Sequence, residues 1–181
     1  MNRSRKKPTF VLVAALSLDG RLTAGDNEGS EWTSKEDKRF FQNELDRADA
    51  IIMGRRTYEA IKRPLRPRNR IVLSRSASPP LQRGRLRGGG CLIILKDPTA
   101  IQLMNLLKKH LWTRIAVVGG TAIYDWFLKR GLVDELCLTL EPVVFGAGKL
   151  LTDAPLRTFR RFSLKSVKHL NKRGTLLLHY Q

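Results

Sequence analysis

The sequence contains few cysteines, few acidic residues and no long hydrophobic run. Its two cysteines, Cys91 and Cys137, form no CxxC pair. They therefore indicate neither a disulfide framework nor a zinc site, and we expect a reducing, cytoplasmic setting. No stretch reaches the ~18 apolar residues of a membrane span, so we expect no membrane partner. The apolar run from Phe10 to Leu18 lacks a cleavage signal and is interpreted as a buried strand rather than a signal peptide.

Acidic residues are scarce, because 16 Asp and Glu stand against 34 Lys and Arg, which gives a net charge of +18. This balance excludes an acidic solvating chain and points to nucleic acid, phosphorylated small molecules or anionic surfaces. A basic nucleic-acid-binding module stays open as an alternative function. The chain shows no RNP signature and no interleaved exposed aromatics, so we do not expect nucleic acid as the primary partner.

The length of 181 residues suits one domain, which we place at residues 9–181 behind a basic N-terminal tail of residues 1–8. Hydrophobic patterning predicts strands at 10–15, 50–53, 71–73, 91–95, 115–118 and 136–140, and helices at 35–48, 57–61, 99–110 and 121–129. It also predicts a long loop at 76–90 and an antiparallel pair at 162–167 and 175–179. Together these indicate an α/β fold with a mostly parallel central sheet, helices on both faces and an antiparallel C-terminal edge.

Two glycine turns each connect a predicted strand to the following helix, one at Gly54 and one at Gly119–Gly120. Ligands of open α/β sheets bind at the carboxyl ends of strands, and helix N-termini attract anions. Two such turns suit the pyrophosphate of a dinucleotide, although the chain has no G-x-G-x-x-G fingerprint. Glycines that only make tight turns explain either site alone equally well.

Arginines and hydroxyls gather at the same predicted edge of the sheet. Arg55 and Arg56 follow the first glycine turn, and Ser74, Arg75 and Ser76 end the next strand. Guanidinium groups pair well with phosphate, and hydroxyls add donors. A 2′-phosphate would fit between the two groups, which favours NADPH over NADH.

Three stretches carry a family resemblance. Residues 50–61 (AIIMGRRTYEAI), 63–74 (RPLRPRNRIVLS) and 117–124 (VVGGTAIY) resemble dihydrofolate reductase. The same superfamily includes the reductase domain of the bifunctional riboflavin-biosynthesis deaminase-reductase. Four further stretches are similar to that second branch: 17–21, 32–36, 132–136 and 143–149. The resemblance implies a dihydrofolate-reductase-like fold from about Phe10 to the C-terminus.

The resemblance also implies a substrate site. Asp37, five residues after Trp32, matches the acidic residue that binds the pterin ring, and Thr139 matches the hydroxyl that links this acid to the pterin. Phe41 matches the ring that packs on the substrate, and Arg68 matches the partner of the folate glutamate. Taken without the resemblance, Asp37 is better explained as a residue that caps the helix or faces solvent, with Ser34 or Thr33 as the N-cap. The implied catalytic residues are Asp37 and Thr139, and the implied substrate-binding residues are Ala14, Asp37, Phe41, Ile61, Arg68 and Thr139.

For the cofactor NADPH, the resemblance and the two turns imply contacts along the carboxyl edge of the sheet. The set is Ala15, Leu22, Thr23, Gly54, Arg55, Arg56, Thr57, Leu73, Ser74, Arg75, Ser76, Val118, Gly119, Gly120, Thr121, Ala122, Ile123 and Tyr124. The chain departs from the family at the turn that reads Gly-Gly-Thr and at Arg66–Pro67, where Pro-Gly is usual.

The expected activity is reduction of 7,8-dihydrofolate to tetrahydrofolate by hydride transfer from NADPH. The alternative within the superfamily is reduction of 5-amino-6-(5-phosphoribosylamino)uracil in riboflavin biosynthesis. The expected partner is thus a pterin or pyrimidine small molecule, with no metal, and the chain is expected to be a monomer or a homodimer. A deaminase zinc motif is missing, so no fused deaminase is expected.

Overall fold

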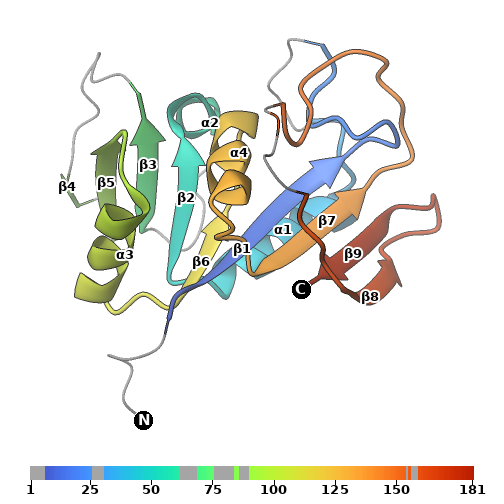
Figure 1. Ribbon diagram of the computed structural model, residues 1–181. Coiled ribbons are helices and arrows are strands. Elements are labelled where there is room, and N and C mark those ends of the chain that lie inside the picture. The colour runs from blue at the N-terminus through green and yellow to red at the C-terminus, as the bar shows by residue number, and fades with distance from the viewer. Residues whose placement is uncertain are drawn as a thin grey trace.

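A computed structural model describes residues 7–25, 31–61, 69–75, 84–85, 90–153, 155 and 159–181. Its nine described strands form one sheet in the order β4-β5-β3-β2-β6-β1-β7-β9-β8 (Figure 1). The strands are β1 Thr9–Leu16, β2 Ala50–Gly54, β3 Arg70–Ser74, β4 Gly84–Arg85, β5 Cys91–Lys96, β6 Arg114–Val117, β7 Glu135–Leu140, β8 Leu164–His169 and β9 Leu176–Tyr180. The helices are α1 Lys35–Asp46, α2 Arg55–Ala60, α3 Ala100–Lys109 and α4 Thr121–Lys129.

The six strands from β5 to β7 run parallel to their neighbours, and β9 and β8 add an antiparallel edge. This confirms the predicted fold class. The predicted loop at 76–90 was wrong in one respect, because Gly84 and Arg85 pair antiparallel with Leu92 and Cys91. Glycine and arginine carry no strand pattern of their own, so the pairing comes from the adjacent β5 edge.

The helix boundaries follow from local capping. Ser34 caps α1, because its side chain accepts a hydrogen bond from the Asp37 amide. At its other end α1 stops at Asp46, two residues earlier than predicted. Helix α2 begins at Arg55, directly after the extended Gly54, rather than at the predicted Thr57. The helix therefore begins immediately at the carboxyl end of β2.

Alternate residues of the parallel strands supply two separate cores. In β1, Phe10 and Leu12 belong to the cluster that contains Leu107 of α3 and Phe127 of α4. Val13 packs instead with the aromatic residues of α1. Figure 1 shows α3 and α4 on one face of the sheet and α1 on the other. Both faces are covered, as expected for parallel strands with continuous apolar runs. None of the described helices is long and apolar enough to cross a membrane.

A charged brace joins α1 to the amino ends of β6 and β7. Arg114 donates to Glu135 at 2.9 Å and to Glu44 at 3.2 Å, and His179 lies 3.3 Å from Glu135. Glu44 is buried, whereas Arg47, its second partner, has a side chain 66% exposed. Burial raises the pKa of Glu135, but the hydrogen bond and charge of Arg114 outweigh it and the net pKa is lowered. Arg114 is therefore the cation on which two carboxylates depend.

We expect Arg114→Ala to lower the free energy of unfolding by about 3 kcal/mol, because among the described residues it leaves the buried Glu44 with only the exposed Arg47 and leaves Glu135 with only His179. Arg47→Ala removes an exposed partner of the same Glu44 and should cost at most about 1 kcal/mol. Urea unfolding at neutral pH measures both. Equal losses in the two variants would contradict a brace centred on Arg114.

Candidate functional site

Asp37 and Thr139 meet on the α1 face of the sheet. Asp37 lies in the first turn of α1 and is 7% exposed, and Thr139 lies in β7 and is 1% exposed. The hydroxyls of Thr139 and Thr33 hydrogen-bond to the Asp37 carboxyl group. Parallel pairing places Ala15 of β1 beside Thr139. The structure therefore brings the two implied catalytic residues into contact.

Burial raises the pKa of Asp37 above its ordinary value. The two threonine hydroxyls and the charge of Lys38 oppose this change, and the negative charge of Glu141 adds to it. The carboxyl group therefore holds a proton more readily than an aspartate in water does. Such a group can accept hydrogen bonds from a ring edge when ionised and can donate one when protonated.

The implied apolar contacts divide between the two faces. Phe41 and Ile61 both pack against the cluster on the α1 side, together with Tyr58. Ala14 belongs to the cluster on the α4 side, so its side chain lies on the opposite face from Asp37. Arg68 lies outside the described residues. Phe41 and Ile61 thus form an apolar wall on the face that carries Asp37.

The two glycine turns lie side by side at the carboxyl edge. The Gly54 amide donates to the Gly119 carbonyl at 2.8 Å. A Cβ at Gly54 would lie 3.1 Å from Ile123, and a Cβ at Gly119, where φ is +108°, would lie 3.1 Å from the Tyr124 hydroxyl. Both glycines are therefore required by close packing of the chain itself. Gly120 has more room, since its Cβ would meet only the Thr57 hydroxyl, at 3.5 Å.

Helices α2 and α4 start from these turns with glycine as the N-cap. Within the described residues, neither N-cap makes a side-chain hydrogen bond to its helix. The Ile123 amide donates to the Gly120 carbonyl at 2.8 Å, so in the first turn of α4 it is the amides of Thr121 and Ala122 that an anion could reach. Leu73, Val118 and Ile123 are buried. Any contact from these three to a ligand would come from the backbone, while Ala122 is exposed.

The implied phosphate-binding arginines differ in their surroundings. Arg55 donates from Nε to Glu59 at 2.7 Å, and its side chain is 16% exposed. Arg56 and Arg75 are exposed, and Ser74 is half-buried. Ser76 lies outside the described residues. Of the three arginines, Arg56 and Arg75 have the exposure that a contact with a cofactor phosphate needs.

The segment with Leu22 and Thr23 is bound to a second loop, residues 143–150. The Leu22 amide donates to the Lys149 carbonyl at 2.7 Å, and the Thr23 hydroxyl accepts from the Lys149 amide at 3.1 Å. Gly148 has φ of +131°, and a Cβ there would overlap the Thr23 carbonyl. Asp19 accepts from the amides of Phe145 and Gly146, and these and other hydrogen bonds lower its pKa. The two loops form one hydrogen-bonded unit.

Two implied cofactor contacts use their hydroxyls within the protein. The Thr121 hydroxyl donates to the Leu150 carbonyl at 2.7 Å, and the buried Tyr124 hydroxyl donates to the Val13 carbonyl at 2.8 Å. Burial also raises the pKa of Tyr124. These residues hold α4 against β1 and the 143–150 loop, so any direct contact they make with a cofactor would not use the hydroxyl proton.

Two residues near Asp37 were missed by sequence reasoning as site candidates. Glu141 is buried directly after β7, and the indole N–H of Trp32 is buried without a partner among the described residues. The Trp32 ring packs edge-on against Phe145 at 5.0 Å between centroids. Both carry a signal in hindsight, since Glu141 is two residues beyond Thr139 and Trp32 is five before Asp37.

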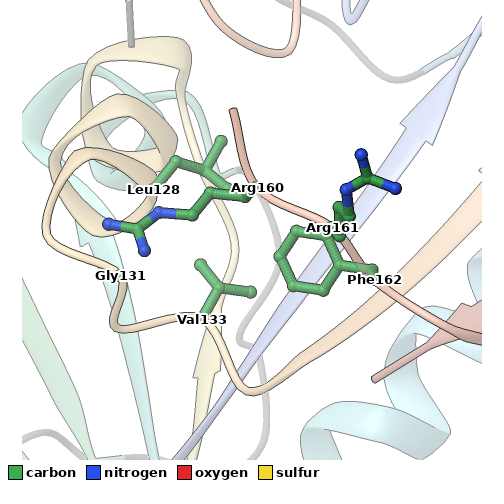
Figure 2. A pocket seen from close by; sticks show the side chains of 6 residues that line it. All are labelled: Leu128, Gly131, Val133, Arg160, Arg161 and Phe162. Atoms are coloured by element: carbon green, nitrogen blue, oxygen red, sulfur yellow. The ribbon is translucent and has the colours of Figure 1, made fainter. Parts of the chain in front are cut away.

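A shallow cavity of about 190 Å³ lies elsewhere, at the C-terminal end of α4 (Figure 2). Its lining includes Gly131, Arg160, Arg161 and Phe162 and shares no residue with the predicted site. Figure 2 shows the guanidinium groups of Arg160 and Arg161 pointing in different directions, so they do not converge on one ligand. Among the described residues, no cluster of three or more His, Cys, Asp or Glu could hold a metal ion.

Comparisons with known proteins agree with this fold. The model of the RibD C-terminal domain family matches residues 8–176. Dihydrofolate reductase from Candida albicans is 26% identical over 142 residues, which cover 74% of this chain and 68% of the relative. The structure of Acinetobacter baumannii RibD has a TM-score of 0.77 at 23% identity, covering 96% of this chain and 58% of RibD. Dihydrofolate reductase from Enterococcus faecalis, complexed with NADP(H), has a TM-score of 0.67 at 17% identity, covering 97% and 96%.

Replacement of Asp37 by Asn should change how stability depends on pH. Because the pKa of Asp37 is raised in the folded state, the stability that Asp37 contributes is fully present below the unfolded pKa of about 3.9. This contribution is lost as the pH rises through the folded pKa. Asp37→Asn lacks this loss, so its melting temperature relative to wild type should increase with pH. Asp153→Asn, at an exposed position, should show no such trend. A constant offset for Asp37→Asn at all pH values would contradict the raised pKa.

Proposed function

We propose, from the premise that the chain belongs to the RibD C-terminal domain family, that this oxidoreductase reduces dihydrofolate with NADPH. The Asp37–Thr139 contact is the observation that carries the proposal. A buried carboxyl group, oriented by a hydroxyl and lying beside the apolar wall of Phe41 and Ile61, has the chemistry that a pterin ring needs.

The chain's own residues would bind and polarise the pterin. The Asp37 carboxylate can accept two hydrogen bonds from the amino-pyrimidine edge, and Thr139 fixes its orientation. Bound NADPH supplies a hydride for C6 of the ring. A proton would also have to reach N5, and we assign it to water, because the Asp37 carboxylate would be accepting hydrogen bonds from the amino-pyrimidine edge. The protein thus contributes orientation and electrostatics.

The carboxyl edge of the sheet supports NADPH as the cofactor. Gly120 leaves room for a close approach, and the amides at the start of α4 suit a pyrophosphate. The exposed Arg56 and Arg75 suit the 2′-phosphate that distinguishes NADPH from NADH. The fit rests on these groups rather than on Thr121 or Tyr124, whose hydroxyls serve the fold.

A second candidate substrate is the phosphoribosylamino-pyrimidine of riboflavin biosynthesis. The family match and the structural likeness to RibD favour it. Its pyrimidine ring offers hydrogen-bonding groups to Asp37, as a pterin does, and its phosphate would suit a strongly basic chain.

We expect NADPH oxidation with dihydrofolate, and a loss of most turnover in Asp37→Asn near neutral pH with NADPH binding retained. Each substrate is offered separately, and methotrexate is added as a competitor. Oxidation with the phosphoribosylamino-pyrimidine alone would assign the second candidate. Unchanged dihydrofolate turnover in Asp37→Asn would refute the role of this carboxyl group.

Arg75→Gln should raise KM for NADPH about tenfold and leave KM for NADH unchanged, since a charge-assisted hydrogen bond contributes about 1.5 kcal/mol or more. Lys168→Gln removes an equal charge from the exposed β8 strand and should change neither value. Parallel changes with both cofactors, or equal changes in the two variants, would indicate general charge attraction instead.

A further inference from the structure

Glu141 is a buried carboxylate that the proposed reaction does not use. It follows β7 directly, is 4% exposed, and accepts two hydrogen bonds from distant parts of the chain. The Ser34 amide donates to it at 2.8 Å, and the Thr175 hydroxyl donates at 2.7 Å. Both of its oxygens are therefore occupied by donors from outside its own strand.

These contacts fix the turn of helix that carries Asp37. Ser34 is the N-cap of α1, and its side chain accepts from the Asp37 amide at 3.1 Å. Thr175, in the connection between β8 and β9, is 1% exposed and also accepts from the Asn171 side chain at 2.8 Å. Through Glu141, the start of α1, the end of β7 and the β8–β9 hairpin are held as one unit.

The negative charge of Glu141 acts on Asp37 as well. Among the described residues, two groups act on the Asp37 carboxyl group by charge, namely Glu141 from the end of β7 and Lys38 from α1 itself. The other two groups that face it, Thr33 and Thr139, are neutral hydroxyls. Lys38 is exposed and screened by water, whereas Glu141 is buried, so the buried like charge is screened less.

The hydrogen bonds account for a carboxylate at this position. The Ser34 amide and the Thr175 hydroxyl each donate to one of its oxygens, and Thr175 itself accepts from Asn171. A glutamine would present its oxygen to one donor and its amide N–H2 group to the other, which would leave one donor without an acceptor. The same carboxylate also acts by charge on Asp37.

We propose that Glu141 is a positioning residue, whose carboxylate holds the first turn of α1, and with it Asp37, against β7 and the β8–β9 hairpin. The negative charge of Glu141 also raises the pKa of Asp37, which favours its protonated form. This inference rests on the proposed function, in which Asp37 binds the substrate ring. Glu141 then extends to higher pH the range in which Asp37 can donate a hydrogen bond as well as accept one.

The test follows the Asp37 carboxyl carbon by ¹³C NMR across a pH titration of the full chain without ligand. Glu141→Gln should move the Asp37 midpoint to lower pH, because it removes the buried negative charge that raises the pKa of Asp37. Glu36→Gln is the matched control. It makes the same chemical change in the same turn of α1, at a half-buried residue that exerts no resolved effect on Asp37. Its midpoint should equal that of the wild type.

Steady-state turnover across the same pH range separates this inference from the proposed function. The limb of kcat/KM that Asp37→Asn abolishes should shift with the NMR midpoint in Glu141→Gln.

Should Glu141→Gln fail to fold, Glu141→Asp keeps the charge but shortens the reach to Ser34 and Thr175. It should lower kcat and leave the midpoint within a few tenths of a unit. A wild-type midpoint in folded Glu141→Gln, or a large shift in Glu141→Asp, would overturn the role of the charge. Full turnover in Asp37→Asn would instead overturn the proposed function.

Discussion

Parallel pairing of β1 with both β6 and β7 determines which residues can meet at the carboxyl edge of the sheet. It places Ala15 beside Thr139 on one side, and on the other it brings β6 to its end at the glycine turn that starts α4. Because strands in a parallel sheet all end at the same edge, the buried Asp37 and the helix start proposed to bind the cofactor phosphates lie at one edge. At the opposite, amino ends of β6 and β7, the ion pairs of Arg114 with Glu135 and Glu44 help to keep these strands in place.

The same pairing explains why most of the fold could be predicted from the sequence. Continuous apolar runs identified the buried strands. Ser34 and Thr33 marked the start of α1, because a cap is a local signal, and the structure shows that Ser34 is the cap. The glycine turns were found for the same reason. Strand β4 was missed because Gly84 and Arg85 have no periodicity, and its pairing depends only on the neighbouring β5 edge.

The candidate site was less predictable, because its side chains form hydrogen bonds with residues that lie far away in the sequence. Asp37 and Thr139 were implied by a family resemblance and do meet. The hydroxyl of Tyr124 bonds to a carbonyl 111 residues away, and no local pattern reveals that. The i,i+4 pairing of Arg55 with Glu59 was missed, because the predicted helix began at Thr57 and left Arg55 outside it. Glu141 was overlooked because a single carboxylate after a strand is unremarkable until its burial is known.

The bond between residues 17–25 and 143–150 has a consequence for how this scaffold could be diversified. A side chain at position 148 would overlap the Thr23 carbonyl. Asp19 accepts hydrogen bonds from the backbone amides of Phe145 and Gly146 in the other segment. If only one of the two segments were replaced by that of a relative, the hydrogen bonds between them would lose their partners. The two segments would therefore have to be exchanged together, although more than a hundred residues separate them in the chain.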